Sequence, residues 1–301
     1  MPLFAIHNLK KKLLGRKDNL ETSYPIREGI RFVHRNPKLF NIGDFLASPR
    51  HYFRFSRALE GATVVGGGIF DPRKNIIKKF CLNPSSCAVW GAGFAQGMNE
   101  KETVVSDLPF RAWSYRDMKY VPDDNFVPCV SCFHPLSSIA SKGDRTLVFL
   151  NDDPKVTPYE CRYSVEKICR DRGWLLAWNS SSEKDLLRSF ELTNQVITNS
   201  FHGSYWGLLS ERSVKVIAHN MKFISMFEGM GLEGSSLVHV YGRRDGEGLL
   251  ENLRCTQAED FVFLKNAKTM RADFQSRNIK FAKKLIDCGL FDDVELASEN
   301  Q

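Results

Sequence analysis

The sequence predicts an α/β protein made of two doubly wound, Rossmann-like domains, and three observations lead to this fold class. Short apolar runs typical of buried strands alternate with segments of helical periodicity through most of the chain. Several of the runs end in glycine, or in the asparagine, serine and threonine residues that favour a turn before a helix. The polar segment 137–144 interrupts the alternation. We therefore expect two βα-alternating halves with a cleft between them.

The first half is expected over 29–140, after a basic N-terminal segment at 1–28. Its strands are predicted at the apolar runs 29–34, 62–65, 87–90 and 110–117. A helix is predicted over 73–80. Another helical pattern follows the first strand and carries Phe45, Leu46, Tyr52, Phe53 and Phe55.

The second half is expected over 145–265, followed by a C-terminal helix and tail over 266–301. Strands are predicted at 145–150, 174–178, 196–197 and 214–217. Helices are predicted over 163–172 and 183–192, from His202 onward, and over 267–288, where apolar side chains recur at helical spacing.

Composition narrows the class of protein. A hydrophobic content of 43% is enough for buried cores and excludes a disordered chain. The net charge of +7 fits an anionic substrate or a membrane surface. The basic residues are scattered except at 10–12 and 16–17, which argues against a nucleic-acid partner.

The N-terminal stretch favours a cytoplasmic location. No apolar run is long enough to span a membrane, and the first residues lack a long apolar core of a signal peptide. The amphipathic stretch from Leu3 to Leu14 could contact the inner membrane face as a peripheral segment. The alternative is a solvated tail.

Eight cysteines are spread along the chain, and reduced thiols are expected because no secretory signal is present. The pattern Cys129-x-x-Cys132-x-His134 has the appearance of a zinc or redox motif. A structural zinc site needs four ligands, and the other close pair, Cys81 and Cys87, is loosely spaced. No metal site is therefore assigned.

The stretch 195–217 carries the strongest signal for a ligand site. A short apolar run ends at Thr198-Asn199-Ser200, and His202-Gly203 then opens a helix. Such a turn lies at the carboxyl end of a strand, where α/β sheets bind ligands. The free N–H groups of the helix suit a phosphate or carboxylate, and a histidine there can donate to that anion or move a proton. The alternative is a capping turn with a histidine that only packs.

Comparable turns occur in the first half. Asn41 and Asp44 flank Gly43, which permits close approach of the backbone, although Asp44 could equally be a helix cap. Gly67 and Gly68 follow the second predicted strand. Arg116 and Asp117 end the strand 110–117 and could form either a ligand site or a surface ion pair.

Together these motifs resemble the polysaccharide pyruvyl transferases. The order Asn41-Ile42-Gly43-Asp44, Gly66-Gly67-Gly68, Tyr115-Arg116-Asp117 and Thr198 to Gly203 carries the likeness, over roughly 29–227. The family has a two-domain fold similar to the GT-B glycosyltransferases. Its members move the enolpyruvyl group of phosphoenolpyruvate onto sugar hydroxyls, usually forming a pyruvate ketal. Phosphoenolpyruvate is thus the expected donor, no further cofactor is implied, and the expected acceptor is a glycan or a lipid-linked sugar.

The resemblance implies roles for named residues. His202 would be the acid or phosphate ligand, with Asn199, Ser200 and Gly203 lining the anion site. Arg116 would be the cation from the first half, and Asp44 and Asn41 would orient the sugar beside Gly43 and the loop at Gly67 and Gly68. Many family members have an arginine two residues before the histidine, where this chain has Ser200. Lys222 could supply that cation, or could be a solvated lysine.

Three other functions share these features. They are a nucleotide-sugar glycosyltransferase, a noncatalytic glycan- or phosphate-binding protein and, from charge alone, a nucleic-acid binder. Aromatic side chains that could stack on sugar faces or form the core are Trp113, Tyr115, Tyr205 and Trp206.

Overall fold

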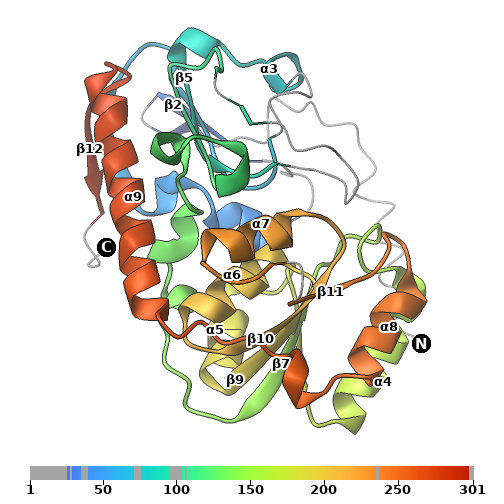
Figure 1. Cartoon of the computed structure of the whole chain (residues 1–301). Coiled ribbons are helices and arrows are strands. Elements are labelled where there is room, and N and C mark those ends of the chain that lie inside the picture. Colours follow the sequence, from blue (N-terminus) through green and yellow to red (C-terminus); the bar gives the residue numbers. More distant parts are fainter. Residues whose placement is uncertain are drawn as a thin grey trace.

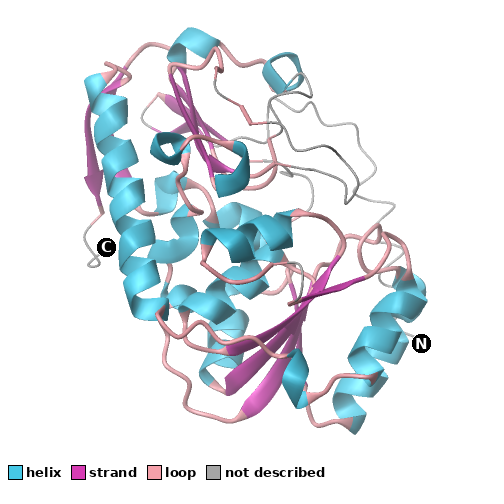
Figure 2. Cartoon of the chain, in the orientation of Figure 1, coloured by secondary structure: helices cyan, strands magenta, loops and turns pink. Residues whose placement is uncertain are grey.

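A computed structural model shows an α/β molecule with two five-stranded sheets (Figures 1 and 2). It describes residues 26–27, 29–34, 40–70, 76–94, 104–105, 107–234 and 237–297. The predicted α/β class with parallel sheets is confirmed. The basic segment 1–28 lies almost entirely outside the described residues.

The first sheet has the order β1-β2-β4-β5-β6. Its strands are β1 (Ile26–Arg27), β2 (Ile30–Val33), β4 (Thr63–Val65), β5 (Cys87–Ala92) and β6 (Ala112–Tyr115). All neighbours are parallel except β1 and β2. Strands β4, β5 and β6 are buried along their whole length, which explains why they read as continuous apolar runs. The four strands predicted in this half are confirmed.

The second sheet is wholly parallel, with the order β11-β10-β9-β7-β8. Its strands are β7 (Arg145–Leu150), β8 (Leu175–Trp178), β9 (Thr193–Thr198), β10 (Ser213–Ala218) and β11 (Val238–Val240). The chain first adds β8 on one side of β7 and then returns to add β9 on the other. This reversal creates a topological switch point between β7 and β9, where doubly wound sheets bind ligands.

Helices cover both faces of the second sheet, as a doubly wound half requires (Figure 1). In the part of the chain that the structure describes, the helices are α2 (Ile42–Leu46), α3 (Ile76–Lys79), α4 (Arg162–Asp171), α5 (Glu183–Glu191), α6 (Phe201–Leu209), α7 (Lys222–Gly229), α8 (Gly246–Arg254) and α9 (Ala267–Asp287). Short 3-10 helices lie at Pro49–His51, Pro84–Ser86, Met118–Tyr120, Asp123–Asn125, Val130–Phe133, Pro135–Ser137, Tyr159–Cys161 and Ala258–Asp260. Helices α4 and α8 pack on one face, and α5 and α6 pack on the other.

The first sheet is not doubly wound by its own half of the chain. Strands β2, β4, β5 and β6 follow one another in sequence order, without a reversal. One face is instead covered by α9 and by the antiparallel pair β3 (Phe53–Ala58) and β12 (Phe291–Leu296). The indole Nε1 of Trp90 donates to Asn278 Oδ1 at 2.7 Å, which ties α9 to β5. The predicted C-terminal helix and tail thus complete the core of the first half.

The helical pattern expected through Phe55 is wrong beyond the first turn. Phe53 and Phe55 are buried while Arg54 and Ser56 are exposed, which is the alternation of a strand. The segment forms β3 because β12, more than two hundred residues later, supplies its hydrogen-bonding partner.

The two sheets are joined by a shared apolar cluster, which includes Val65 and Trp113 from the first and Phe149 and Val196 from the second. The connection between them runs through the 3-10 helices at 130–137. None of the described helices has the length and apolar character needed to cross a bilayer.

Candidate functional site

The site forms where β9 ends and α6 begins, beside the switch point. Ser200 is the N-cap of α6, but its side chain makes no capping hydrogen bond. Thr198 Oγ1 instead accepts the Ser200 N–H at 2.9 Å. The first main-chain N–H groups of a helix have no acceptor within the helix, so those of α6 give its N-terminus a positive partial charge.

His202 occupies the first turn of α6 and is only 3% exposed. Its Nε2 lies 3.5 Å from Cys129 Sγ, and its ring centroid lies 5.4 Å from that of Trp206. Burial lowers the pKa of His202 well below its ordinary value, and the charges of Arg116 and Lys222 lower it further. The imidazole is therefore neutral near pH 7.

Gly43 is the point at which the first half touches His202. A Cβ on Gly43 would lie 2.1 Å from His202 Nδ1 and 2.5 Å from Cγ, so only glycine allows this approach. Asn41 is the N-cap of α2, and its Oδ1 accepts from the N–H groups of Gly43 and Asp44. The side-chain oxygen of Asn41 thus holds α2 in place, and Asp44 lies half-buried in the first turn of that helix.

Arg116 follows β6 and reaches toward α6. Its guanidinium carbon lies 3.7 Å from the centroid of the Phe201 ring, a stacked cation–π contact. The side chain is 6% exposed, and neither Nε nor Nη1 has a hydrogen-bond partner among the described residues. The surface ion pair considered for Arg116 and Asp117 is wrong, because both side chains are buried.

The carboxylate of Asp117 faces the interior. Its Oδ2 accepts the Phe94 N–H at 2.8 Å, and Oδ1 has no hydrogen-bond partner among the described residues. Burial raises the pKa of Asp117 to about 6, against the opposing charge of Arg116 and the Phe94 hydrogen bond.

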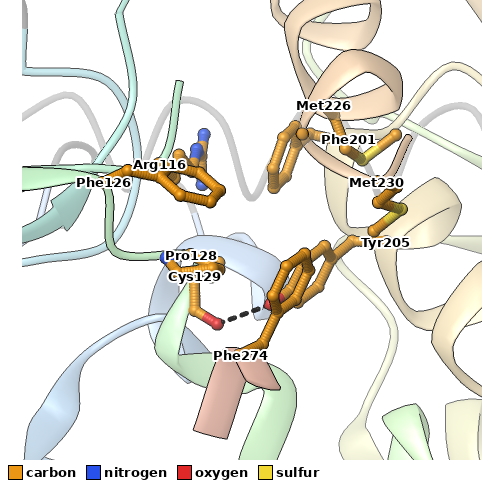
Figure 3. Close-up of a pocket in the computed structure, with 10 residues that line it drawn as sticks. Arg116, Phe126, Pro128, Cys129, Phe201, Tyr205, Met226, Met230 and Phe274 are labelled. Carbon is orange, nitrogen blue, oxygen red and sulfur yellow. Dashed lines mark hydrogen bonds between the residues drawn. The ribbon is translucent and has the colours of Figure 1, made fainter. Parts of the chain in front are cut away.

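A small cavity lies beside Arg116, where elements of both halves meet (Figure 3). Its lining is Arg116, Phe126, Pro128, Cys129, Phe201, Tyr205, Met226, Gly229, Met230 and Phe274. The volume is about 10 Å³, which is room for about one water molecule. The wall of this cavity thus combines one buried cation with unpaired donors and a lining of aromatic and methionine side chains.

The remaining candidate residues have other surroundings. Asn199 is fully buried, donates to Thr157 and Tyr241 and accepts from the Asn151 N–H, so its side chain fastens loops at the sheet edge rather than lining the anion position. Lys222 begins α7, and its Nζ lies 4.9 Å from the centroid of the Phe223 ring. The charge of Lys222 reaches His202, since it lowers the pKa of that imidazole.

Gly67 and Gly203 act through close packing, and Gly68 through its backbone conformation. A Cβ on Gly67 would lie 2.3 Å from the Asp44 carbonyl oxygen, and both Gly67 and Gly68 have positive φ values of 81° and 94°. A Cβ on Gly203 would lie 2.5 Å from the Phe149 ring, so this glycine lets α6 approach β7. They position α2 and α6 and contribute no side chain to the site.

The Cys129, Cys132 and His134 side chains contact different neighbours. Cys132 is buried beside Asn278, and burial raises its pKa well above the ordinary value. His134 Nε2 lies 3.0 Å from Glu183 Oε1. Among the described residues, no group of three metal-ligating side chains comes together.

Sequence reasoning missed Cys129 as a neighbour of His202, and it missed the apolar lining of the cavity. The four candidate sugar-stacking aromatics, Trp113, Tyr115, Tyr205 and Trp206, are all less than 10% exposed, as expected of core residues. Tyr205 also lines the cavity and donates its hydroxyl to the Cys129 carbonyl at 2.8 Å.

Comparison with models of protein families gives no match, and the searches of curated proteins and of solved structures find no similar protein either.

Proposed function

We propose that this protein is a transferase that moves the pyruvyl group of phosphoenolpyruvate onto hydroxyls of a glycan or lipid-linked sugar, forming a ketal. The observation that carries the proposal is the buried guanidinium of Arg116, with unpaired Nε and Nη1, stacked on the first residue of α6. In the pyruvyl transferases that the sequence resembles, an arginine commonly precedes the histidine. Here Arg116 comes to the same helix terminus from the other half of the chain.

The proposal includes a GT-B-like arrangement in which the two halves bind the donor between their sheets. Arg116 follows a strand of the first sheet, and His202 follows a strand of the second. Because the cavity holds about one water molecule, the donor enters only when the two halves move apart.

The charge balance at His202 suits the first chemical step. Burial and the two cations keep the imidazole neutral. A bound phosphate is negatively charged and therefore raises the pKa of His202. Donor binding thus converts the neutral imidazole to the imidazolium that acts as the acid. The imidazolium then protonates the methylene carbon of phosphoenolpyruvate, leaving an oxocarbenium-like centre at the neighbouring carbon.

The later steps join the sugar to this carbon and release the phosphate. The sugar hydroxyl forms a C–O bond to this centre and releases its proton to a base, and the phosphate then leaves with the electrons of its C–O bond. A second hydroxyl adds to the carbon that the phosphate has left and loses its proton to that phosphate, which closes the ketal, while the proton held by the base restores the imidazolium. Asp44, on α2 beside Gly43, is the residue we assign to the acceptor, and Arg116 with the terminus of α6 holds the donor anion.

The test is phosphate release from phosphoenolpyruvate by the purified protein in the presence of a panel of lipid-linked and free glycans. We expect His202→Gln to abolish release while the far-ultraviolet circular dichroism stays unchanged. The matched control is His134→Gln, which replaces another buried histidine, one whose Nε2 pairs with Glu183 rather than with Cys129. Full release by His202→Gln would contradict the mechanism.

A nucleotide-sugar glycosyltransferase and a noncatalytic binding protein would each give a different result when ligand-induced stabilisation and phosphate release are measured. A glycosyltransferase would be stabilised by uridine or guanosine diphosphate sugars rather than by phosphoenolpyruvate. A binding protein would be stabilised by phosphoenolpyruvate without releasing phosphate.

One distance favours a second candidate function, thiol-dependent hydrolysis. The 3.5 Å between Cys129 Sγ and His202 Nε2 is the spacing of a nucleophile and its base. Cys129 is only 1% exposed, however, and the lowered pKa of His202 makes it a poor base. Burst release from an activated ester, lost in Cys129→Ala, would support hydrolysis over transfer.

A further inference from the structure

A chain of polar side chains runs from the core to His202. Trp206 Nε1 donates to Ser131 Oγ at 3.1 Å, Ser131 Oγ lies 3.2 Å from Cys129 Sγ, and Cys129 Sγ lies 3.5 Å from His202 Nε2. Trp206, Ser131 and Cys129 are each no more than 1% exposed. Water therefore does not compete for these groups, and each donor needs an acceptor within the chain.

The chemistry of the first member gives the chain a direction. An indole N–H can only donate, so Ser131 Oγ accepts from Trp206, and the hydroxyl hydrogen of this buried serine needs an acceptor of its own. Among the described residues, the acceptor within reach of that hydroxyl is Cys129 Sγ. The sulfur accepts it and can direct its own S–H at the next atom, which is His202 Nε2.

We infer that Cys129 is a positioning residue that fixes the tautomer of His202, with the thiol donating to Nε2 and the ring hydrogen held on Nδ1. The consequence for catalysis rests on the proposed function, whereas the contacts of Cys129 with Ser131 and His202 do not depend on it. It places the transferable hydrogen on the nitrogen that faces Gly43, at the contact between the two halves.

A thiol suits both protonation states of the histidine. Towards the neutral ring it donates S–H to Nε2. When a bound anion charges the ring, Nε2 gains a hydrogen and the sulfur accepts it, since a thiol is both a weak donor and a weak acceptor. To change from donor to acceptor, the Cys129 thiol only has to rotate its S–H about the Cβ–Sγ bond. The main chain of Cys129 is also tied to α6, because Tyr205 donates to its carbonyl at 2.8 Å.

The test is long-range ¹H–¹⁵N correlation of the histidine rings in protein labelled with ¹⁵N, with the His202 signals assigned by their loss in His202→Gln. We expect neutral His202 to carry its hydrogen on Nδ1 in the unaltered protein and in Cys129→Ser, which keeps a donor and an acceptor. In Cys129→Ala both tautomers should coexist. Cys132→Ala is the control, because this neighbouring thiol contacts Asn278 rather than His202 and its loss should leave the tautomer unchanged.

Turnover gives the second readout. We expect Cys129→Ala to lower kcat by about tenfold, a partial loss for a residue acting through the acid, with KM for phosphoenolpyruvate within about twofold. Cys129→Ser should recover most of kcat. A ring hydrogen on Nε2 in the unaltered protein, or an unchanged tautomer in Cys129→Ala, would overturn the inference. The ring spectra need no substrate, so an absence of pyruvyl transfer would remove the proposed function and leave this result standing.

Discussion

The guanidinium of Arg116 lies 3.7 Å from the centre of the Phe201 ring, and this contact joins the carboxyl end of β6 to the first residue of α6. It brings a buried cation from the first sheet to the helix terminus of the second. The stack continues from Phe201 to Tyr205 and on to Phe274 of α9, with centroid separations of 5.8 and 5.9 Å. Three parts of the chain that are distant in sequence thus meet at the cavity in Figure 3.

Removing the Arg116 guanidinium should remove anion binding. Phosphoenolpyruvate at about 100 times its Kd should raise the unfolding free energy of the unaltered protein by about 2.7 kcal/mol. We expect Arg116→Gln to lose most of this gain because Nε and Nη1 provide the unpaired donors. Thermal unfolding with and without ligand measures the difference.

The control for that prediction is Arg277→Gln. Arg277 also lies against the cavity lining, 5.1 Å from the Phe126 ring centroid, but it is paired with Asp123 and Asp273. Its loss should leave the ligand-induced stabilisation intact. Equal losses in the two variants would mean that positive charge, rather than the position of Arg116, attracts the ligand.

Gly43→Ala should displace His202. The added Cβ would lie 2.1 Å from Nδ1, so either the imidazole or α2 has to shift. A misplacement of about 1 Å is enough to lower turnover about 100-fold. We expect this loss of phosphate release together with a lower unfolding free energy, although alanine favours a helix over glycine by about 1 kcal/mol.

Gly246→Ala is the matched substitution, since it lies at the first position of α8 and a Cβ there meets its nearest atom at an ordinary 3.4 Å. Turnover should be unchanged and stability equal or higher. A fully active Gly43→Ala would show that His202 does not need its observed position.

Asp117 should make the protein less stable as pH rises. Burial raises its pKa to about 6 from 3.8, so the folded state binds more protons than the unfolded state between these values. The unfolding free energy therefore falls as pH increases from about 4 to about 6, by about 3 kcal/mol for this group, and then levels off. Asp117→Asn should remove this part of the pH dependence and be more stable than the unaltered protein at pH 7.

Chemical denaturation at several pH values provides the measurement, with Asp124→Asn, at an exposed position, as the control. If Asp117→Asn and Asp124→Asn changed the profile equally, the carboxylate of Asp117 would not be buried as described.

Arg212 should be essential to stability without taking part in the site. Its guanidinium is 1% exposed and donates to the carbonyls of Phe190, Thr193, Ser210 and Ile139. Burial lowers its pKa to about 10, which still leaves it charged at pH 7. We expect Arg212→Met to lower the unfolding free energy by at least about 3 kcal/mol, because several buried carbonyls lose their donor.

Arg145→Met is the comparison, since Arg145 is exposed and donates to the Gly173 carbonyl from the surface. We expect Arg145→Met to lower the unfolding free energy by less than about 1 kcal/mol. Urea unfolding measures both losses. Similar losses in the two variants would contradict a stabilising role for the hydrogen bonds that Arg212 donates to buried carbonyls.

The sequence allowed the central elements of the fold to be predicted and left their contacts hidden. The strand 145–150 agrees with β7 at both ends because its residues 147 to 150 form a continuous buried apolar run, which is typical of a parallel strand. Segment 53–58 was misassigned because Tyr52, Phe53 and Phe55 fit helical spacing and strand alternation alike, and the deciding partner is β12. Local pattern cannot identify a partner so far along the chain.

For the site too, the position of the central residue could be predicted from the sequence and its contacts could not. His202 at the start of a helix after a strand follows from residues that lie next to one another, and the structure places it there. Its contacts with Gly43 and Cys129 depend on how the two sheets pack, which no local pattern encodes. The residue type of Asn199 suits a polar turn at an anion site, but its amide donates to Thr157 and Tyr241 instead.

The return of α9 and β12 to the first sheet affects how the molecule can be made. Phe281, Leu285 and Phe291 complete a core whose other members include Phe32 and Trp90. A ribosome that has synthesised the first half has therefore produced a sheet with one apolar face still uncovered, and that face waits until α9 and β12 have emerged. Nascent chains halted before α9 should accordingly be bound by chaperones, while the released protein should not.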